Sequence, residues 1–217
     1  MIDPLDFSGF VLLADAVPDA LQDLRYHTTF NFIGRQVDGY ELPCALLARQ
    51  AAEALRPAVE ASRRLGLRLK VLDAYRPQRA VDCFVRWAAD EDDASMKPWF
   101  YPETEKKDLY ALDFIGRRSR HIRGSAVDLT LVDMGTGMDL DMGGPFDFFG
   151  PRSNYRWDGL TPRQAENRRL LRSLMAGCGF VPLEAEWWHF SLGEEPFPDT
   201  YFDFPIDCAV VNRLKGR

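Results

Sequence analysis

The stretch "AVDLTLVD" (residues 126–133) alternates between two kinds of side chain, and this alternation predicts a β-strand. The apolar residues at 127, 129 and 131 would share one face of the strand. The other face carries Asp128 between Ala126 and Thr130. A carboxylate on such a face requires a cation or hydrogen bonds to compensate for the water that it loses. Asp128 is therefore the first residue of this sequence that needs a chemical explanation.

Other segments also have strand character. "LRLKVLDAY" (67–75) alternates apolar with charged residues, as a half-buried strand does, and "EWWHFSL" (186–192) is rich in aromatic residues. Glycines at 135, 137, 143 and 144 bracket "MDLDM" (138–142), which predicts a return strand that forms a hairpin with residues 126–133.

The clearest helix signal lies in "TPRQAENRRLLRSLMAGCGF" (161–180). Thr161 is placed to cap the first turn, Gln164 completes a capping box with it, and Gly177 ends the helix. Residues 93–118 are mixed in character and contain two prolines, so we expect mostly loop with room for one short helix. Further helices are predicted at residues 43–66, kinked or split at Pro57, and at residues 76–92, with Pro77 in the first turn.

The predicted helices are grouped before and after the strands, and the two do not alternate regularly. This order favours an α+β fold with a mainly antiparallel central sheet flanked by helices. The sequence contains no repeat, no low-complexity block and no Ser/Gly-rich linker. We therefore expect residues 1–217 to form a single domain.

Composition and charge narrow the class of protein. Of the 217 residues, 46% are hydrophobic, which is enough for a buried core. A net charge of −6 argues against a nucleic-acid-binding protein, which requires a basic surface. No uncharged apolar run reaches about 18 residues, so no membrane span is expected. Acidic residues stand where an export signal has basic ones, and the four cysteines form no C-x-x-C pair, so we expect a cytoplasmic protein with reduced thiols.

Two of the three histidines stand near acidic residues. His121 precedes Asp128 by seven positions, and His189 follows Glu186 by three, in "LEAEWWHF" (183–190). His121, Asp128 and His189 would supply the three ligands that hydrolytic zinc sites use, with a fourth position open to water. Each residue alone is more commonly part of a packed core, and aromatic segments of this kind are mostly buried packing. The spacing leaves both interpretations open.

Several segments together carry a resemblance to a known family. "SRHIRGSAVDLTL" (119–131) and "EWWHF" (186–190) resemble the signatures of the D-alanyl-D-alanine dipeptidases, zinc peptidases related to the D-alanyl-D-alanine carboxypeptidases and to the hedgehog-type fold. The resemblance extends, in the family's order, over nearly the whole chain. It also takes in "YHTTFNFIG" (26–34), "DAYRPQRAVDCFVRWA" (73–88), "GGPFDFFG" (143–150), "AENRRLLRSLM" (165–175) and "YFDFPI" (201–206).

The resemblance implies a role for each candidate residue. His121, Asp128 and His189 would hold one zinc ion per chain. Glu186 would act as the general base and acid of a peptide hydrolysis. Arg76 would stabilise the oxyanion of the tetrahedral intermediate.

The resemblance also implies how the substrate binds. Asp147, in "PFDF", would be the partner of the substrate's free ammonium group, with Ser119 and Tyr26 as further contacts in the cavity. A carboxylate in that place would restrict the site to dipeptides. From the residues alone, two alternatives stay open, namely Arg76 as a structural partner of Asp73 and Asp147 as a loop cap.

The segment before His121 carries more positive charge than the resemblance implies. Arg117, Arg118 and Arg120 belong either to a solvated strand edge or to the cleft. In the second case, they would favour a substrate with an additional carboxylate over D-alanyl-D-alanine itself.

The spacing of Glu186 and His189 predicts a backbone irregularity. In a regular strand these two side chains would point to opposite faces and lie about 10 Å apart, at roughly 3.3 Å per residue. If both serve one zinc ion, the chain between them must bulge, twist or turn. We expect Trp187 and Trp188 to flank this irregularity, with at least one of them packed to hold it.

The function that the resemblance implies is hydrolysis of D-alanyl-D-alanine, or of a closely related D,D-dipeptide, to free amino acids. Such an enzyme would deplete the precursor of cell-wall peptides, as in antibiotic resistance, or recover products of peptidoglycan turnover. One alternative is a carboxypeptidase or murein peptidase of the same superfamily, against which the missing export signal argues. Another is a non-catalytic hedgehog-like zinc module, against which the presence of both Glu186 and Arg76 argues.

Overall fold

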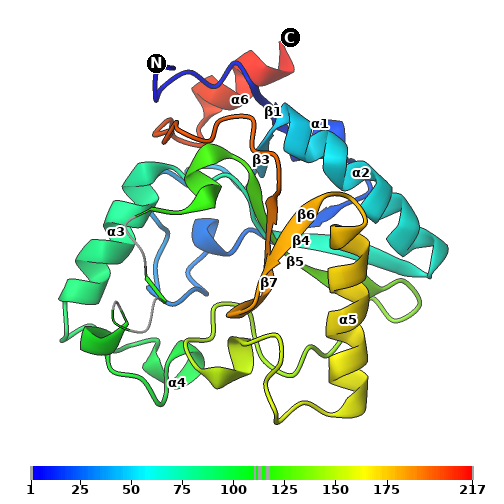
Figure 1. The fold of residues 1–217 in the computed structure, drawn as a ribbon. Coiled ribbons are helices and arrows are strands. Elements are labelled where there is room, and N and C mark those ends of the chain that lie inside the picture. Colours follow the sequence, from blue (N-terminus) through cyan, green and yellow to red (C-terminus); the bar gives the residue numbers. More distant parts are fainter. Residues whose placement is uncertain (1, 110, 112–113, 116–117, 217) are drawn as a thin grey trace.

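A five-stranded sheet forms the centre of the computed structural model (Figure 1), which describes residues 2–109, 111, 114–115 and 118–216. The two strands at one edge of this sheet pair in parallel, and all other neighbouring strands pair antiparallel. The predicted α+β fold with a mainly antiparallel central sheet is therefore confirmed. In spatial order the strands are β2 (Leu21–Gln22), β4 (Leu67–Asp73), β5 (Ala126–Asp133), β7 (Glu186–Leu192) and β6 (Phe180–Leu183).

Helices flank this sheet. The longest, α2 (Arg49–Arg64) and α5 (Pro162–Ala176), contact each other and lie on one side of the sheet, whereas α3 (Gln78–Ala89) lies on the other (Figure 1). Among the described helices, none combines the length and the hydrophobicity that a membrane span needs. The remaining elements are a small sheet of β1 (Phe10–Leu12) and β3 (Leu46–Ala48), the helices α1 (Leu13–Ala16), α4 (Lys97–Phe100) and α6 (Cys208–Lys215), and the 3-10 turns η1 (Arg25–His27), η2 (Lys106–Asp108), η3 (Arg120–Arg123) and η4 (Pro151–Ser153).

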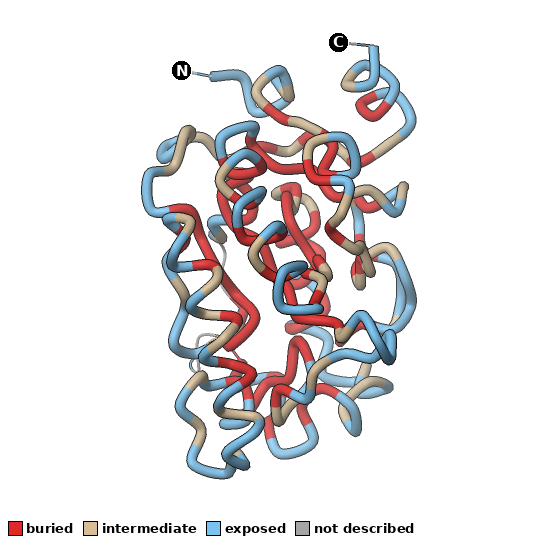
Figure 2. The backbone as a smooth tube through the Cα atoms, turned by 90° about the vertical axis from the view of Figure 1, so that its right-hand side faces the viewer, coloured by how far each residue is buried: buried red, intermediate tan, exposed pale blue. Residues whose placement is uncertain are grey.

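Strand β5 is buried along both of its faces. Its apolar face joins the main hydrophobic core, and on the opposite face Asp128 and Thr130 are only 2% and 3% exposed. Figure 2 shows that, among the described residues, buried segments run through the middle of the molecule and exposed turns lie outside. The alternation in the sequence therefore separates a core face from a buried polar face, and it leaves Asp128 away from bulk water.

The helix with the strongest local signals forms as predicted. In α5 the Thr161 oxygen accepts a hydrogen bond from the backbone N–H of Gln164 at 3.3 Å, and the Gln164 side chain accepts one from the N–H of Thr161 at 2.9 Å. This reciprocal pair satisfies two backbone donors that would otherwise lack partners at the helix start. The expected short helix between residues 93 and 118 is also present, as α4.

Two helix boundaries differ from the prediction. Helix α2 begins at Arg49 instead of near residue 43, because residues 46–48 pair with β1 as β3. Pro57 lies inside α2 without splitting it, since the buried apolar face of the helix compensates for the hydrogen bond that proline cannot donate. Pro77 precedes α3 as its N-cap and does not lie in its first turn.

The predicted return strand at residues 138–142 is reduced to a single β-bridge between Val132 and Asp139. The chain then leaves the sheet because Asp141 turns towards α5. The Asp141 side chain accepts a hydrogen bond from Gln164, and its carbonyl accepts one from Asn167, both at 2.8 Å. Pairing with the helix thus replaces pairing with β5.

Candidate active site

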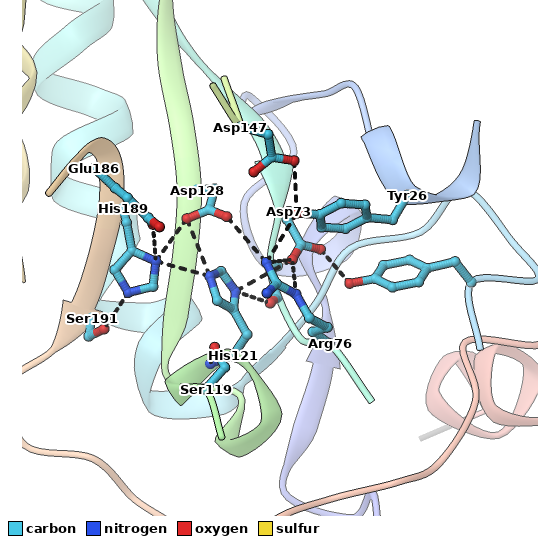
Figure 3. A network of polar contacts seen from close by, with 12 residues as sticks. Tyr26, Asp73, Arg76, Ser119, His121, Asp128, Asp147, Glu186, His189 and Ser191 are labelled. Atoms are coloured by element: carbon cyan, nitrogen blue, oxygen red, sulfur yellow. Dashed lines mark hydrogen bonds and ion pairs between the residues drawn. The ribbon is translucent and has the colours of Figure 1, made fainter. Parts of the chain in front are cut away.

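Two histidines and an aspartate converge on the polar face of the sheet (Figure 3). Strand register places Asp73, Asp128 and His189 in one row across β4, β5 and β7. His121 approaches this row from η3. Its Nε2 lies 3.1 Å from His189 Nδ1, and Asp128 Oδ1 lies 3.3 Å from the first nitrogen and 3.0 Å from the second. This buried group is able to hold a metal ion.

The spacing of these three atoms fits a tetrahedral zinc ion. Zinc binds histidine nitrogen and carboxylate oxygen at about 2.0–2.1 Å, so a regular tetrahedron has edges of about 3.3–3.4 Å between ligand atoms. The three observed separations, 3.0, 3.1 and 3.3 Å, are close to such edges. Two imidazole nitrogens and one carboxylate oxygen are a donor set typical of hydrolytic zinc, with the fourth vertex left for water or substrate.

Each imidazole is held through its other nitrogen. His121 Nδ1 lies 2.6 Å from the carbonyl oxygen of Ala74, so this nitrogen donates and Nε2 keeps its lone pair. His189 Nε2 lies 3.0 Å from the Ser191 hydroxyl oxygen, an arrangement that leaves Nδ1 as the candidate ligand atom. Partners of this kind fix the tautomer and the ring orientation of metal-binding histidines.

A short turn delivers His121 to the site. The Ser119 hydroxyl accepts a hydrogen bond from the backbone N–H of His121 at 3.2 Å and caps η3. Gly124 ends the turn with φ at 68°, and a Cβ there would lie 2.3 Å from the ring of Phe10. Both the left-handed conformation and the close approach require glycine. The chain then enters β5 and reaches Asp128.

The predicted irregularity between Glu186 and His189 is present. Strands β6 and β7 stay in register as far as the Pro182–Phe190 pair, but Leu183 then pairs with Glu186. One step along β6 thus matches four along β7, and residues 187–189 form a bulge. The bulge brings Glu186 Oε2 within 3.8 Å of His189 Nδ1.

Aromatic packing surrounds this bulge, as expected. The rings of Trp187 and Trp188 are both buried and meet edge to face at 5.4 Å, and Trp188 contacts Phe146 at the same distance. Burial raises the pKa of Glu186, although the charge of His189 opposes the rise. A carboxylate with a raised pKa next to the ligand set is suited to accept a proton and to return it.

Arg76 forms an ion pair with Asp73, and it also faces the candidate metal ligand Asp128. Its guanidinium contacts Asp73 Oδ2 through two nitrogens at 2.9 and 3.0 Å, and it lies 3.6 Å from Asp128 Oδ2. The guanidinium also packs over the ring of Tyr26 at 5.0 Å. The alternative of Arg76 as a partner of Asp73 is therefore realised, and it holds the positive charge beside the candidate metal site.

Asp147 lies at one end of the site in an unusual state. It is buried, its φ of 59° makes it the only non-glycine residue with positive φ in the described part of the chain, and it accepts a hydrogen bond from the Tyr26 hydroxyl at 2.8 Å. Burial, together with the charge of Asp128, raises the pKa of Asp147 well above its ordinary value. A strained and desolvated carboxylate of this kind is more typical of a binding site than of a loop cap.

The residues singled out in the sequence line a single cavity of about 430 Å³. Arg118 and Arg120 also line it, so these two belong to the cleft. Arg117 lies outside the described residues. The eight candidates brought together are Tyr26, Arg76, Ser119, His121, Asp128, Asp147, Glu186 and His189.

Comparison with known proteins agrees with this geometry. A family model described as D-ala-D-ala dipeptidase matches residues 6–207. The chain belongs to this family. It is accordingly a metallopeptidase, and the α+β fold is consistent with that of the D-ala-D-ala dipeptidase family.

Individual relatives match over most of their length. The chain is 40% identical over 198 residues to a D-alanyl-D-alanine dipeptidase of Enterococcus faecium, covering 91% of this chain and 98% of that protein. It is 42% identical over 197 residues to one of Streptomyces coelicolor, with coverage of 91% and 98%. A D-alanyl-D-alanine dipeptidase of Escherichia coli is 36% identical over 187 residues, or 86% of each chain.

Two further residues, which the sequence analysis did not single out, support the candidate site. Ser191 orients His189 and lies two positions after it on β7, so the two-residue period of a strand was the available signal. Arg168, in α5, is 1% exposed and donates to the backbone carbonyls of Met142, Arg152 and Asn154. It ties down both ends of the loop that carries Asp147. No sequence pattern reveals a side chain that binds backbone carbonyls.

Proposed function

We propose that this protein hydrolyses D-alanyl-D-alanine, or a closely related D,D-dipeptide, to free amino acids. The relatives named above are all called D-alanyl-D-alanine dipeptidases. Within the site, the observation that carries the proposal is the burial of Asp147. This buried carboxylate has no ion pair within the described residues, although a buried charge requires compensation. The free ammonium group of a dipeptide would provide it.

We propose zinc as the metal, with one ion per chain held by His121, Asp128 and His189. The near-tetrahedral spacing and the nitrogen and oxygen donors support this choice. When bound, zinc would polarise the scissile carbonyl and make a water molecule acidic near neutral pH.

The chain's own residues would then carry the proton and stabilise the developing charge. Glu186 would accept a proton from the attacking water and pass it to the nitrogen of the leaving amino acid as the C–N bond breaks. The carboxylate produced by this cleavage stays on the first amino acid. Arg76, held in place by Asp73, would donate hydrogen bonds where the carbonyl oxygen becomes negative, and such a donor typically contributes about 100 to 1000-fold in rate.

Asp147 and Tyr26 would decide the reaction class. A carboxypeptidase leaves room on this side for a longer chain, whereas a carboxylate that binds a free amino group restricts the substrate to a dipeptide. The hydrogen bond from the Tyr26 hydroxyl orients this carboxylate. Ser119, which caps the turn before His121, would add a contact to the second residue of the substrate.

We further propose that residues 1–217 act as one domain in the cytoplasm. All four cysteines are free thiols, which supports a reducing compartment. The net charge of −6 supports a small-molecule partner over a nucleic acid. In this setting the enzyme would act on a cell-wall precursor or on a product of peptidoglycan turnover.

A comparison of two substrates tests the proposed function. The zinc-loaded protein should release D-alanine from D-alanyl-D-alanine, and acetylation of the substrate's amino group should abolish the release. Equal cleavage of the free and the acetylated dipeptide would assign the site to a carboxypeptidase instead. No turnover of any D,D-dipeptide would exclude both.

A further inference from the structure

The zwitterionic substrate of the proposed function poses a question about charge. Its ammonium group would pair with Asp147, and its scissile carbonyl would lie at the metal and Arg76. Its free carboxylate needs a partner as well. A carboxylate taken into a cleft is costly without a hydrogen-bonded cation. If the proposed function holds, this third group must therefore find its own partner in the cleft.

The geometry of the site indicates where the carboxylate must lie. In Figure 3 the ligand residues His121 and Asp128 lie between Asp147 on one side and Ser119 on the other. A dipeptide with its ammonium group at Asp147 and its carbonyl at the metal therefore directs its second residue towards Ser119. The residues that flank Ser119 in the chain are Arg118 and Arg120, and both line the cavity.

Of the cations that line the cavity within the described residues, two are already paired. Arg76 pairs with Asp73 at 2.9 Å, and its remaining donors would serve the scissile carbonyl. Arg120 has its Nε 3.5 Å from Glu195 Oε1, and that carboxylate also binds Arg123 through two nitrogens, at 2.6 and 2.7 Å. Arg120 is therefore less available to the carboxylate of a ligand.

Arg118 differs because it has no ion pair with any acidic residue in the described part of the chain. Its guanidinium carbon lies 5.0 Å from the centre of the Tyr201 ring, so an aromatic face supports the side chain, and among the described residues no hydrogen-bond acceptor takes up its donors. Neighbouring Ser119 accepts the N–H of His121, and its hydroxyl hydrogen remains able to donate to an outside acceptor.

We propose that Arg118 binds the free carboxylate of the substrate's second residue and thereby determines the preference for an unblocked C-terminus. The planar guanidinium matches a carboxylate with two parallel hydrogen bonds. The Ser119 hydroxyl adds a third donor on the same side. Because Glu195 compensates Arg120, the described part of the cleft offers one unpaired cation, Arg118, for one carboxylate, and the second residue needs no acidic side chain.

The test compares D-alanyl-D-alanine with D-alanyl-D-alaninamide, which lacks the carboxylate charge. Both are assayed with the zinc-loaded full-length protein and with its Arg118→Gln, Arg118→Lys and Arg120→Gln variants. For Arg118→Gln we expect kcat/KM on the free acid to fall about tenfold, mainly through KM, because hydrogen bonds to charged groups at exposed positions contribute at the low end of their range. Cleavage of the amide should change little.

The acid-to-amide ratio is the decisive quantity, since differences in leaving-group chemistry between the substrates cancel when variants are compared. The ratio should fall most in Arg118→Gln and less in Arg118→Lys, and it should stay near the wild-type value in Arg120→Gln. A ratio that is unchanged in both Arg118 variants, or that falls only in Arg120→Gln, would overturn the proposal. If the wild-type protein cleaves neither substrate, the proposed function fails instead. If Arg118→Gln does not fold, Arg118→Lys carries the test.

Discussion

At the scale of single residues, Asp147 combines a cost in stability with a proposed gain in binding. Burial raises its pKa, so ionising it costs the folded state free energy. This cost is absent below the pKa of the unfolded chain, about 3.9, and grows as pH rises towards the folded pKa. Asparagine tolerates positive φ and retains an acceptor for Tyr26.

The first prediction concerns Asp147→Asn. In metal-free protein this variant should be more stable than the wild type at pH 7, and the difference should vanish near pH 4. Its kcat/KM on D-alanyl-D-alanine should fall about 10 to 100-fold, because a buried charged hydrogen bond to the substrate is lost. Urea unfolding at the two pH values and steady-state kinetics measure both effects. A less stable variant at pH 7 with undiminished activity would contradict the role of Asp147.

The proposed role of Glu186 as general base can be tested separately from metal binding. It approaches His189 but is not one of the three proposed ligands. Glu186→Gln should therefore keep its zinc content while kcat falls at least about 100-fold, the usual contribution of a general base. Metal analysis of the dialysed variant provides the control. Loss of zinc would make Glu186 a ligand, and retained activity would mean that another group is the base.

At the scale of elements, the bulge in β7 brings the proposed base, Glu186, and a proposed metal ligand, His189, to the same place. Trp188 is 2% exposed and packs against Trp187 and Phe146. Trp188→Ala should cost about 3–5 kcal/mol of unfolding free energy and should lower activity, because the bulge loses its packing. Trp99, which is 62% exposed, supplies the matched control. Trp99→Ala should stay within about 0.5 kcal/mol of the wild type. Equal losses in the two variants would show that the bulge does not depend on this packing.

Helix α5 supports the site from outside through Arg168. Burial lowers the pKa of Arg168 to about 10, and its donors satisfy carbonyls on both sides of the Asp147 loop. Arg168→Gln should leave buried carbonyls without partners, at a cost of about 1–3 kcal/mol for each. We expect a raised KM for the dipeptide with unchanged metal content. Exposed Arg169 is the matched control, and Arg169→Gln should change neither KM nor stability.

Elements with local signals were predictable from the sequence, and elements that depend on distant partners were not. The Thr161 cap and the apolar spacing of α5 are local, and the helix forms where predicted. Strand β3 was hidden within a predicted helix because its pairing with β1 bridges more than thirty residues of chain. The return strand at 138–142 was lost for a similar reason, since Asp141 finds its partners on α5.

At the scale of the whole molecule, the site depends on how the sheet places residues that are far apart in the chain. Asp128 and His189 are register partners on neighbouring strands, and His121 reaches them from a turn. Their spacing in the sequence is compatible both with a packed core and with a metal site, because the sequence alone does not show that the three residues are in contact. The resemblance over many segments favoured the metal site. The bulge followed from chemistry, since one site cannot otherwise hold both Glu186 and His189.

We propose that one zinc ion, held by His121, Asp128 and His189, makes this protein a D,D-dipeptidase. The most direct measurement is the rate of D-alanine release from D-alanyl-D-alanine as zinc is added back to chelator-treated protein. The rate should rise from near zero and reach a plateau at one zinc ion per chain. Release that is undiminished in metal-free protein, or that stays absent after one equivalent of zinc is bound, would contradict the claim.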